Sequence, residues 1–291
     1  MTSPARLFAA VPTPVDPALH VAVEPLAAHC RRLLQSGCEG IVLFGTAGEG
    51  TCFSLAEKLT ALERLIAAGV PPSRILLASG TCALTDAAGA MVAARELGCA
   101  GTLVLPPFFT KKVDDQGLAE WLDALVARSG GGSLWLYHIP QLAGVGFSPP
   151  LARRLLERID GAVRAIKDST ADSTLARALA PEGRAGLYVS TEIGLASNVA
   201  AGITGVISAS LNITLPLVRR ALGGCSAADA KVAALRTYLV QYSLVWSVKA
   251  ALAASTGDPT WRRLMPPHRA PADADEPAFL VKLRALQTDA A

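Results

Sequence analysis

The stretch RILLASGTCALTDAAGAMVAARELGCAGTLVLPP, residues 74–107, decides the fold because it contains one whole strand–helix–strand unit. Its first and last runs, 74–80 and 101–107, are short and almost continuously apolar, which is typical of strands covered on both faces. Between them, 86–98 has helical spacing, with Asp86 as its predicted N-cap and a glycine at its end. A helix that joins two such strands predicts a parallel sheet.

The same alternation occurs eight times along the chain. Apolar runs predict strands at 7–14, 40–45, 74–80, 101–107, 134–140, 162–168, 186–191 and 205–210. Helical spacing predicts helices at 23–37, 54–69, 86–98, 115–128, 149–158, 172–180, 193–201 and 216–222. An open doubly wound sheet also alternates in this way, but no strand is followed by the G-x-G-x-x-G fingerprint of dinucleotide-binding sheets. We therefore predict a closed (β/α)8 TIM barrel.

The residues after the eighth unit predict a helical extension. Residues 227–255 form one long apolar helical region or two, and 277–289 form a last helix after a proline-containing linker. We therefore predict an α/β chain with a barrel catalytic domain at 1–225 and a C-terminal helical domain at 226–291.

Composition limits the class of protein and its compartment. The chain has 291 residues, 51% hydrophobic and 18% charged, and its net charge of +3 is too small to indicate nucleic acid as a partner. No apolar run reaches the roughly 18 residues that a membrane span needs, and the N-terminus lacks a signal-peptide layout. Six cysteines without a C-x-x-C pair predict free, mostly buried thiols, and four histidines without H-E-x-x-H spacing predict no metal site. We therefore expect a cytoplasmic protein with no membrane partner.

Reactive side chains follow several predicted strands, at the end where enzymes with this fold carry their chemistry. They are Thr46 in GTAGEG (45–50), Tyr137, Lys167, Glu192 and Ser208. Two interpretations of Lys167 are open: a strand-end lysine that extends to solvent, or an amine that attacks a ketone to form a Schiff base. Tyr137 is either a core tyrosine or the proton donor and acceptor that such an amine needs.

The stretch GTAGEG, 45–50, is open to two interpretations as well. It is a glycine-rich turn that joins strand to helix, or its backbone N–H groups form a small anion site at the start of the helix. Such a site suits a carboxylate better than a diphosphate, because no P-loop lysine follows. Glu49 is interpreted as a cap or brace of the turn.

Together these motifs resemble the dihydrodipicolinate synthase / N-acetylneuraminate lyase family, which consists of class I Schiff-base lyases with a (β/α)8 barrel and a C-terminal helical domain. The resemblance covers nearly the whole chain. It is carried by GT-x-GE (45–49), Y-x-x-P (137–140) and IKD(S/T) (166–169), with AAVPTPVD (9–16), PPFF (106–109), GVIS (205–208) and VKAAL (248–252) in support.

The resemblance implies a role for each matching residue. Lys167 would form the imine with pyruvate or a related 2-oxo acid, Tyr137 would transfer protons, and Thr46 would belong to the proton relay. The backbone N–H groups of Thr46 and Ala47 would bind the carboxylate of the 2-oxo acid, and Ile207 would lie beside it. The resemblance implies no metal or organic cofactor, and it implies a homo-oligomer, commonly a tetramer built as a dimer of dimers.

Several residues depart from the family's patterns. Ala47 replaces a second hydroxyl residue, and Phe108 and Phe109 replace the tyrosine pair that supplies a relay group to the neighbouring subunit, so Phe109 would line the partner's pocket. Leu142 stands where the synthases have an arginine, as in the lyase branch, and Glu192 alone remains of the acidic pair found in that branch. His138, in place of the usual Asn, is interpreted as a strand-end histidine with satisfied hydrogen bonds. These side chains favour a second substrate, or leaving aldehyde, with few charges and hydroxyls.

We therefore predict a class I lyase or aldolase that makes or breaks a carbon–carbon bond in a 2-oxo acid, with an aldehyde as second partner, rather than a true dihydrodipicolinate synthase. One alternative is a dehydratase or deaminase of 2-oxo-3-deoxy sugar acids that uses the same imine. Another, from a different class, is a catalytically silent protein that binds 2-oxo acids.

Overall fold

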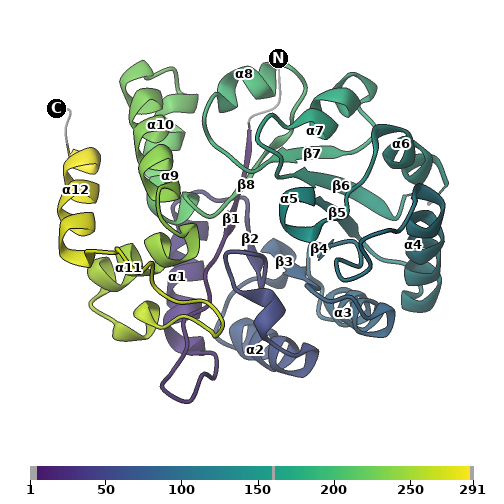
Figure 1. The fold of residues 1–291 in the computed structure, drawn as a ribbon, viewed down its shortest axis with the longest axis horizontal. Coiled ribbons are helices and arrows are strands. Elements are labelled where there is room, and N and C mark those ends of the chain that lie inside the picture. The colour runs from purple at the N-terminus through teal and green to yellow at the C-terminus, as the bar shows by residue number, and fades with distance from the viewer. Residues whose placement is uncertain (1–4, 159–160, 289–291) are drawn as a thin grey trace.

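Eight parallel strands close into a barrel in sequence order, which confirms the predicted fold (Figure 1). The structure is a computed structural model and describes residues 5–158 and 161–288. Each strand pairs with the next, and the first pairs with the last through Arg6 and Gly205. The strands are β1 (Arg6–Ala10), β2 (Gly40–Leu43), β3 (Ile75–Ala78), β4 (Gly101–Val104), β5 (Leu134–His138), β6 (Val163–Asp168), β7 (Gly186–Val189) and β8 (Gly205–Ser208).

Helices surround the barrel on the outside, as Figure 1 shows, and every predicted helix of the barrel is present, with bounds that differ by a few residues in places. Their apolar sides pack on strands that are buried on both faces. The short helix α5 (Pro140–Ala143) is an addition that the sequence does not predict. The others are α1 (Val23–Gln35), α2 (Leu55–Ala67), α3 (Leu84–Glu96), α4 (Asp115–Ser129), α6 (Pro149–Arg158), α7 (Thr174–Leu179), α8 (Leu195–Ala200) and α9 (Leu211–Leu222).

Two helix starts differ from the predicted ones. Helix α3 begins at Leu84, so Asp86 is not its N-cap but lies in the first turn, where its charge still favours the helix dipole. Helix α9 begins five residues before Pro216, which was expected to open it. The side chain of Thr214 donates to the carbonyl of Ser210 at 3.0 Å, a carbonyl that also accepts from the N–H of Thr214, and Pro216 lies inside the helix.

The C-terminal extension has two helices within 227–255 and a third after the linker, namely α10 (Ser226–Val240), α11 (Leu244–Thr256) and α12 (Glu276–Thr288). Tyr238, Trp246 and Phe279 form the centre of a separate small core, with the rings of Tyr238 and Phe279 stacked at 5.4 Å. The division into domains at 225/226 stays a prediction, and its ends at 1–4 and 289–291 lie outside the described residues.

The cysteines are less buried than the composition predicts. All six cysteines are free, as expected, but only Cys30 and Cys38 are buried, and the other four are half-buried.

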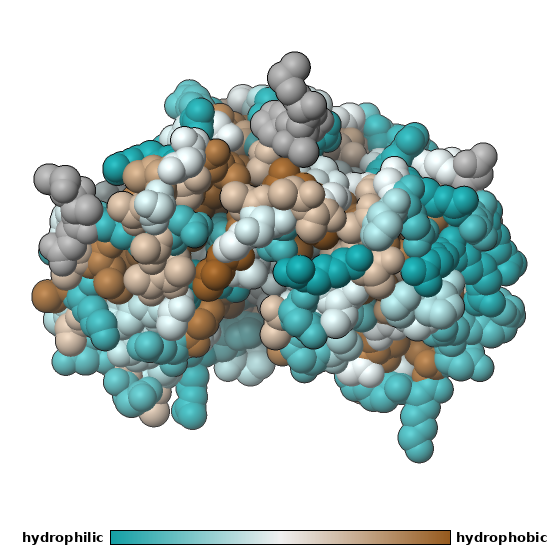
Figure 2. Space-filling model, turned by 90° about the horizontal axis from the view of Figure 1, so that it is seen from above, coloured by the Kyte–Doolittle hydropathy of each residue, from teal (hydrophilic) through white to brown (hydrophobic). Residues whose placement is uncertain are grey.

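The face in Figure 2 is mixed, with hydrophilic residues over most of its right side and apolar residues gathered toward its centre and left. Within 5–158 and 161–288, no helix combines the length and the hydropathy of a membrane span.

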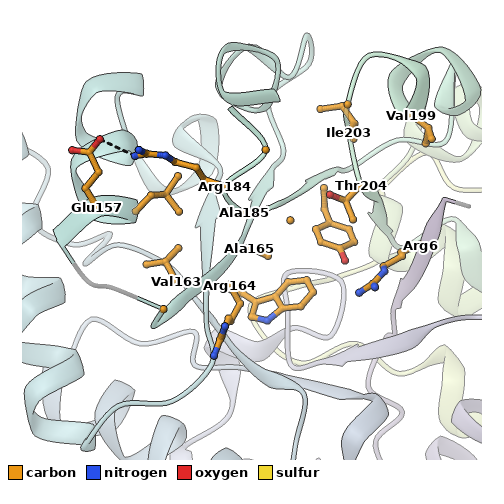
Figure 3. Close-up of a pocket in the computed structure, with 17 residues that line it drawn as sticks. Arg6, Glu157, Val163, Arg164, Ala165, Arg184, Ala185, Val199, Ile203 and Thr204 are labelled. Atoms are coloured by element: carbon orange, nitrogen blue, oxygen red, sulfur yellow. Dashed lines mark hydrogen bonds and ion pairs between the residues drawn. The ribbon is translucent and has the colours of Figure 1, made fainter. Parts of the chain in front are cut away.

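A wide hollow of about 1190 Å³ lies at the amino ends of the strands, opposite the residues singled out above. Its lining includes Arg6, Arg164 and Arg184 (Figure 3). Tyr188, a buried residue of β7, also lines it. Arg184 turns to Glu157 and pairs with it at 2.7 Å, so the guanidinium groups do not converge on one point. The arginines therefore do not form an anion-binding site in this hollow. The candidate catalytic residues lie at the other end of the barrel, at the carboxyl ends of the strands.

A buried histidine makes the stability of the fold depend on pH. His29 is hydrogen-bonded on both ring nitrogens, at 2.8 Å to Asn212 Oδ1 and 2.8 Å to Arg32 Nη2. Because the guanidinium can only donate, Nδ1 must accept, and the ring is neutral with its hydrogen on Nε2. Burial and the charge of Arg32 lower the pKa of His29 to about 4, against the opposing effect of the Asn212 bond.

The unfolded chain therefore takes up a proton on His29 near pH 6.5, and the folded chain does so only near pH 4. Stability from this residue is complete above pH 6.5 and falls as the pH falls toward 4, by about 3 kcal/mol in total. Urea unfolding at several pH values should show this loss in the wild type and a smaller one in His29→Gln, which has no titrating ring. Equal pH dependence in the two proteins would contradict the assignment.

Candidate active site

Lys167 and Tyr137 lie side by side inside the barrel. They are direct partners in the register of β5 and β6, so their side chains leave the sheet on the same face. Lys167 is 4% exposed and Tyr137 is 3% exposed. The amine Nζ of Lys167 lies 4.1 Å from the ring centroid of Tyr137. The interpretation of Lys167 as a strand-end lysine that extends to solvent is therefore wrong.

Thr46 joins this pair from the turn after β2. Its Oγ1 lies 3.0 Å from the hydroxyl of Tyr137, although the two residues are 91 positions apart. Burial by itself would raise the pKa of Tyr137, but the Lys167 ammonium and the Thr46 hydrogen bond outweigh it, and the pKa is lowered. A phenol with a lowered pKa that contacts both a hydroxyl and an amine is suited to proton transfer.

Asp168 fixes the end of β6 directly after the lysine. It is completely buried, and one carboxylate oxygen accepts from the backbone N–H of Thr170 at 2.9 Å and from its hydroxyl at 2.6 Å. The other oxygen accepts from the N–H of Ala176 in α7 at 2.9 Å. The aspartate of the IKD motif thus holds the loop that leaves the strand, and with it the position of Lys167.

Glu49 braces the turn that carries Thr46, which is the role predicted for it. The residue has a positive φ of 53° and is 1% exposed. Its Oε2 accepts from Nζ of Lys249 in α11, and its Oε1 accepts from the backbone N–H of Met265 at 2.8 Å. Lys249, also fully buried, donates to the carbonyl of Arg263 at 2.7 Å. The C-terminal extension therefore anchors the turn beside Tyr137.

A cavity of about 290 Å³ opens against Tyr137 and Thr46. Its other lining residues are mostly apolar. They are Phe44, Gly45, Thr51, Ala78, Gly80, Leu103, Leu105, Phe108, Ile139, Leu142, Ala143 and His268. Lys167 is not among them, but its amine contacts the ring of Tyr137, which lines the cavity.

Of the residues predicted to bind substrate, Leu142 alone lines this cavity. Ala47 lies buried in the turn beside Thr46, and Ile207 is fully buried on β8. Phe109 is 84% exposed and does not line the cavity beside Tyr137, consistent with a place at a neighbouring subunit. The roles of these residues stay predictions.

Glu192 has protein partners instead of a place on the cavity. It is buried, and its two carboxylate oxygens accept from the hydroxyl of Ser210 at 2.9 and 2.8 Å. Arg236 of α10 donates to the same hydroxyl at 2.9 Å. His138 also has a structural partner, because its Nδ1 accepts from the backbone N–H of Phe147 at 3.0 Å. The interpretation of His138 as a satisfied strand-end residue agrees with this geometry.

Two polar residues of the cavity wall were not predicted from the sequence. Thr51 follows the GTAGEG turn, and His268 comes from the linker after α11. No spacing in the sequence points to His268, because only the packing of the linker against the turn brings it to the cavity. Among the described residues, no cluster of three or more His, Cys, Asp or Glu side chains could hold a metal ion.

Comparison with known proteins supports the resemblance found in the sequence. A model of the dihydrodipicolinate synthetase family matches residues 3–255. An uncharacterized DapA-like lyase of Chloroflexus aurantiacus is 31% identical over 267 residues, which cover 87% of each chain. The crystal structure of dihydrodipicolinate synthase from Agrobacterium tumefaciens has a TM-score of 0.89 at 30% identity, covering 97% of this chain and 99% of that one.

A more distant structure shares the fold. N-acetylneuraminate lyase of Proteus mirabilis has a TM-score of 0.83 at 21% identity, with 97% of this chain and 98% of that chain covered. The family match extends over the barrel and into the C-terminal extension, and the relatives are lyases and synthases, which supports an enzyme. The chain belongs to the dihydrodipicolinate synthetase family.

Proposed function

We propose that this protein is a class I lyase that forms a Schiff base between Lys167 and pyruvate or another 2-oxo acid, and that makes or breaks a carbon–carbon bond next to it. The observation that carries the proposal is the buried amine of Lys167 against the ring of Tyr137, whose hydroxyl meets Thr46 at 3.0 Å. An amine held in an apolar interior next to an acid–base group is the arrangement that imine chemistry requires.

In the cleavage direction, the amine of Lys167 attacks the ketone of a 4-hydroxy-2-oxo acid, and water leaves as the imine forms. Tyr137 takes the proton of the C4 hydroxyl, the bond between C3 and C4 breaks, and the electron pair moves into the iminium to give an enamine. The aldehyde departs, C3 takes up a proton, and water hydrolyses the imine to release pyruvate and the free lysine. Aldol addition is the reverse.

The binding sites follow from the same arrangement. The backbone N–H groups of Thr46 and Ala47 hold the carboxylate of the 2-oxo acid, with Ile207 beside it. The aldehyde occupies the cavity that borders Tyr137, because this residue lines the cavity and its ring contacts the amine of Lys167. We also propose that the protein is a cytoplasmic homo-oligomer, a tetramer of paired dimers. The strongly exposed ring of Phe109 supports an oligomer in which a second copy covers it.

The experiment that tests the proposal is chemical trapping. The protein is incubated with pyruvate, treated with borohydride and weighed by mass spectrometry. A covalent adduct of one pyruvate, mapped to Lys167, is the expected result. If no 2-oxo acid gives an adduct, the Schiff-base proposal fails. Products from a panel of aldehydes and of 2-oxo-3-deoxy acids then separate carbon–carbon cleavage from loss of water or ammonia.

Tyr137→Phe tests the acid–base role separately from imine formation. Loss of a positioned acid–base group lowers kcat by about 10²–10⁴-fold. The adduct with pyruvate should still form, because the amine is retained. Steady-state rates and trapping yields give the two readouts. Tyr242→Phe in the small C-terminal core is the matched control and should leave both unchanged.

A further inference from the structure

We propose that His268 selects the second substrate, an aldehyde with an apolar body and a single hydrogen-bonding oxygen. The inference rests on the proposed function and adds to it the class of the carbonyl partner and the residue that recognises it. Three observations carry it: the composition of the cavity wall, the way in which the linker is held, and the size of the cavity.

The cavity wall contains few groups that could satisfy a polar ligand. Among the residues that the structure describes, no Lys, Arg, Asp or Glu lines it, and most lining residues are apolar, including Phe108 and Leu142. Besides the hydroxyls of Thr46 and Thr51, its polar side chains are Tyr137 and His268. A polyhydroxylated or multiply charged aldehyde would leave several polar groups without partners there, and each of these weakens binding. The wall therefore favours an aliphatic or aromatic aldehyde.

The imidazole is held at the cavity by a buried anchor. The backbone N–H of His268 donates to the carbonyl of Met265 at 2.8 Å, and the N–H of Met265 donates to Glu49 Oε1 at 2.8 Å. Lys249 bonds both Glu49 and the carbonyl of Arg263, at the start of the same segment. The linker that carries His268 is thus tied to the turn that carries Thr46. His268 itself is exposed, which places it at the mouth of the cavity.

The size of the cavity limits the substrate. A volume of about 290 Å³ corresponds to about ten water molecules at 30 Å³ each, and so to an aldehyde of roughly ten non-hydrogen atoms. Tyr137 exchanges a proton with the reacting hydroxyl of the substrate. His268 is the other ionisable side chain of the wall, and it bonds an oxygen at the far end of the aldehyde. An imidazole can donate to or accept from such an oxygen.

The test measures aldol addition of pyruvate to three aldehydes, using the full-length protein. They are an aromatic aldehyde without a further polar group, the same ring with one para hydroxyl, and glyceraldehyde. The wild type should prefer the para-hydroxy aldehyde. His268→Leu should raise KM for that aldehyde by about tenfold, the worth of one hydrogen bond, with kcat and the KM for the unsubstituted aldehyde unchanged. His268→Gln should restore part of the preference, and Arg269→Leu, next in the linker and also exposed, should change nothing.

The outcomes separate the inference from the function on which it rests. Absence of a pyruvate adduct in the wild type overturns the proposed function, and the inference with it. If the adduct forms in every variant, three results overturn the inference alone. These are a preference for glyceraldehyde, no turnover of either aromatic aldehyde, and a His268→Leu variant that shifts KM equally for both aromatic aldehydes or for neither.

Discussion

Lys167→Met is expected to abolish the pyruvate adduct and to lower kcat/KM by at least about 10³-fold, the order found when a catalytic nucleophile is removed. Methionine keeps an unbranched apolar side chain in the barrel but has no amine, so the ketone finds no nucleophile. The contact with the ring of Tyr137 is retained through the thioether, which limits the effect on folding. Borohydride trapping followed by mass spectrometry, with steady-state rates, measures both losses.

The matched control is Lys282→Met, which changes an exposed lysine of α12. It should retain the adduct and the full rate. Circular dichroism and thermal unfolding must show that Lys167→Met is folded, so that the loss refers to chemistry. If Lys167→Met still gave an adduct at a single lysine, another amine would be the nucleophile. The buried amine of Lys58, which donates to the carbonyl of Ser79 at 2.6 Å, would then be the first to examine, since burial lowers its pKa to about 8.

Lys249→Met is expected to destabilise the fold more than any change of a surface charge. The substitution leaves the carboxylate of Glu49 buried without its cationic partner, and breaking a buried ion pair on one side costs about 3–5 kcal/mol. For a chain of this size, that loss lowers Tm by on the order of 10 °C. Burial lowers the pKa of Lys249 while Glu49 opposes this, so the pair depends on its close geometry. Scanning calorimetry or urea unfolding gives the measurement.

Two further variants show whether the buried charge is the cause. Glu49→Gln combined with Lys249→Met removes both charges, and Gln can still accept from the N–H of Met265, so part of the stability should return. Arg64→Met breaks an exposed pair with Glu24 and should change stability by less than about 1 kcal/mol. A loss in Lys249→Met no larger than in Arg64→Met would show that the pair does not hold the turn.

Much of the fold could be predicted from the spacing of apolar residues along the chain. The strands are apolar on both faces and short, and the helices between them are amphipathic or alanine-rich, so each element is specified by its own residues and by one neighbour along the chain. Helix α2 starts with a capping box of Ser54 and Glu57, whose S-x-x-E spacing is a local signal of a helix start. The start of α9 differs from the predicted one because the prediction placed Pro216 in the first turn, whereas this proline lies inside the helix.

Only part of the candidate site could be predicted from the sequence. The end of a strand is a local property, so the sequence by itself determined that Thr46, Tyr137 and Lys167 reach the same rim of a (β/α)8 barrel. The period of two along β5 and β6 then puts Tyr137 and Lys167 on one face. The distance of 3.0 Å between Thr46 and Tyr137 depends on the closure of the barrel, which no local pattern specifies.

The tertiary structure alone decided what surrounds these residues. Glu192 follows a strand as its pattern predicts, but it bonds Ser210, because a buried carboxylate takes whatever donors the neighbouring loop and helix present. His268 reaches the cavity because Glu49 binds Lys249 and Met265, contacts that join positions 200 and 216 residues apart. The alternation in the sequence determined the barrel and the rim that carries Lys167. Long-range packing decided which side chains line the cavity, because such contacts form only after the barrel has closed and the C-terminal extension has packed against it.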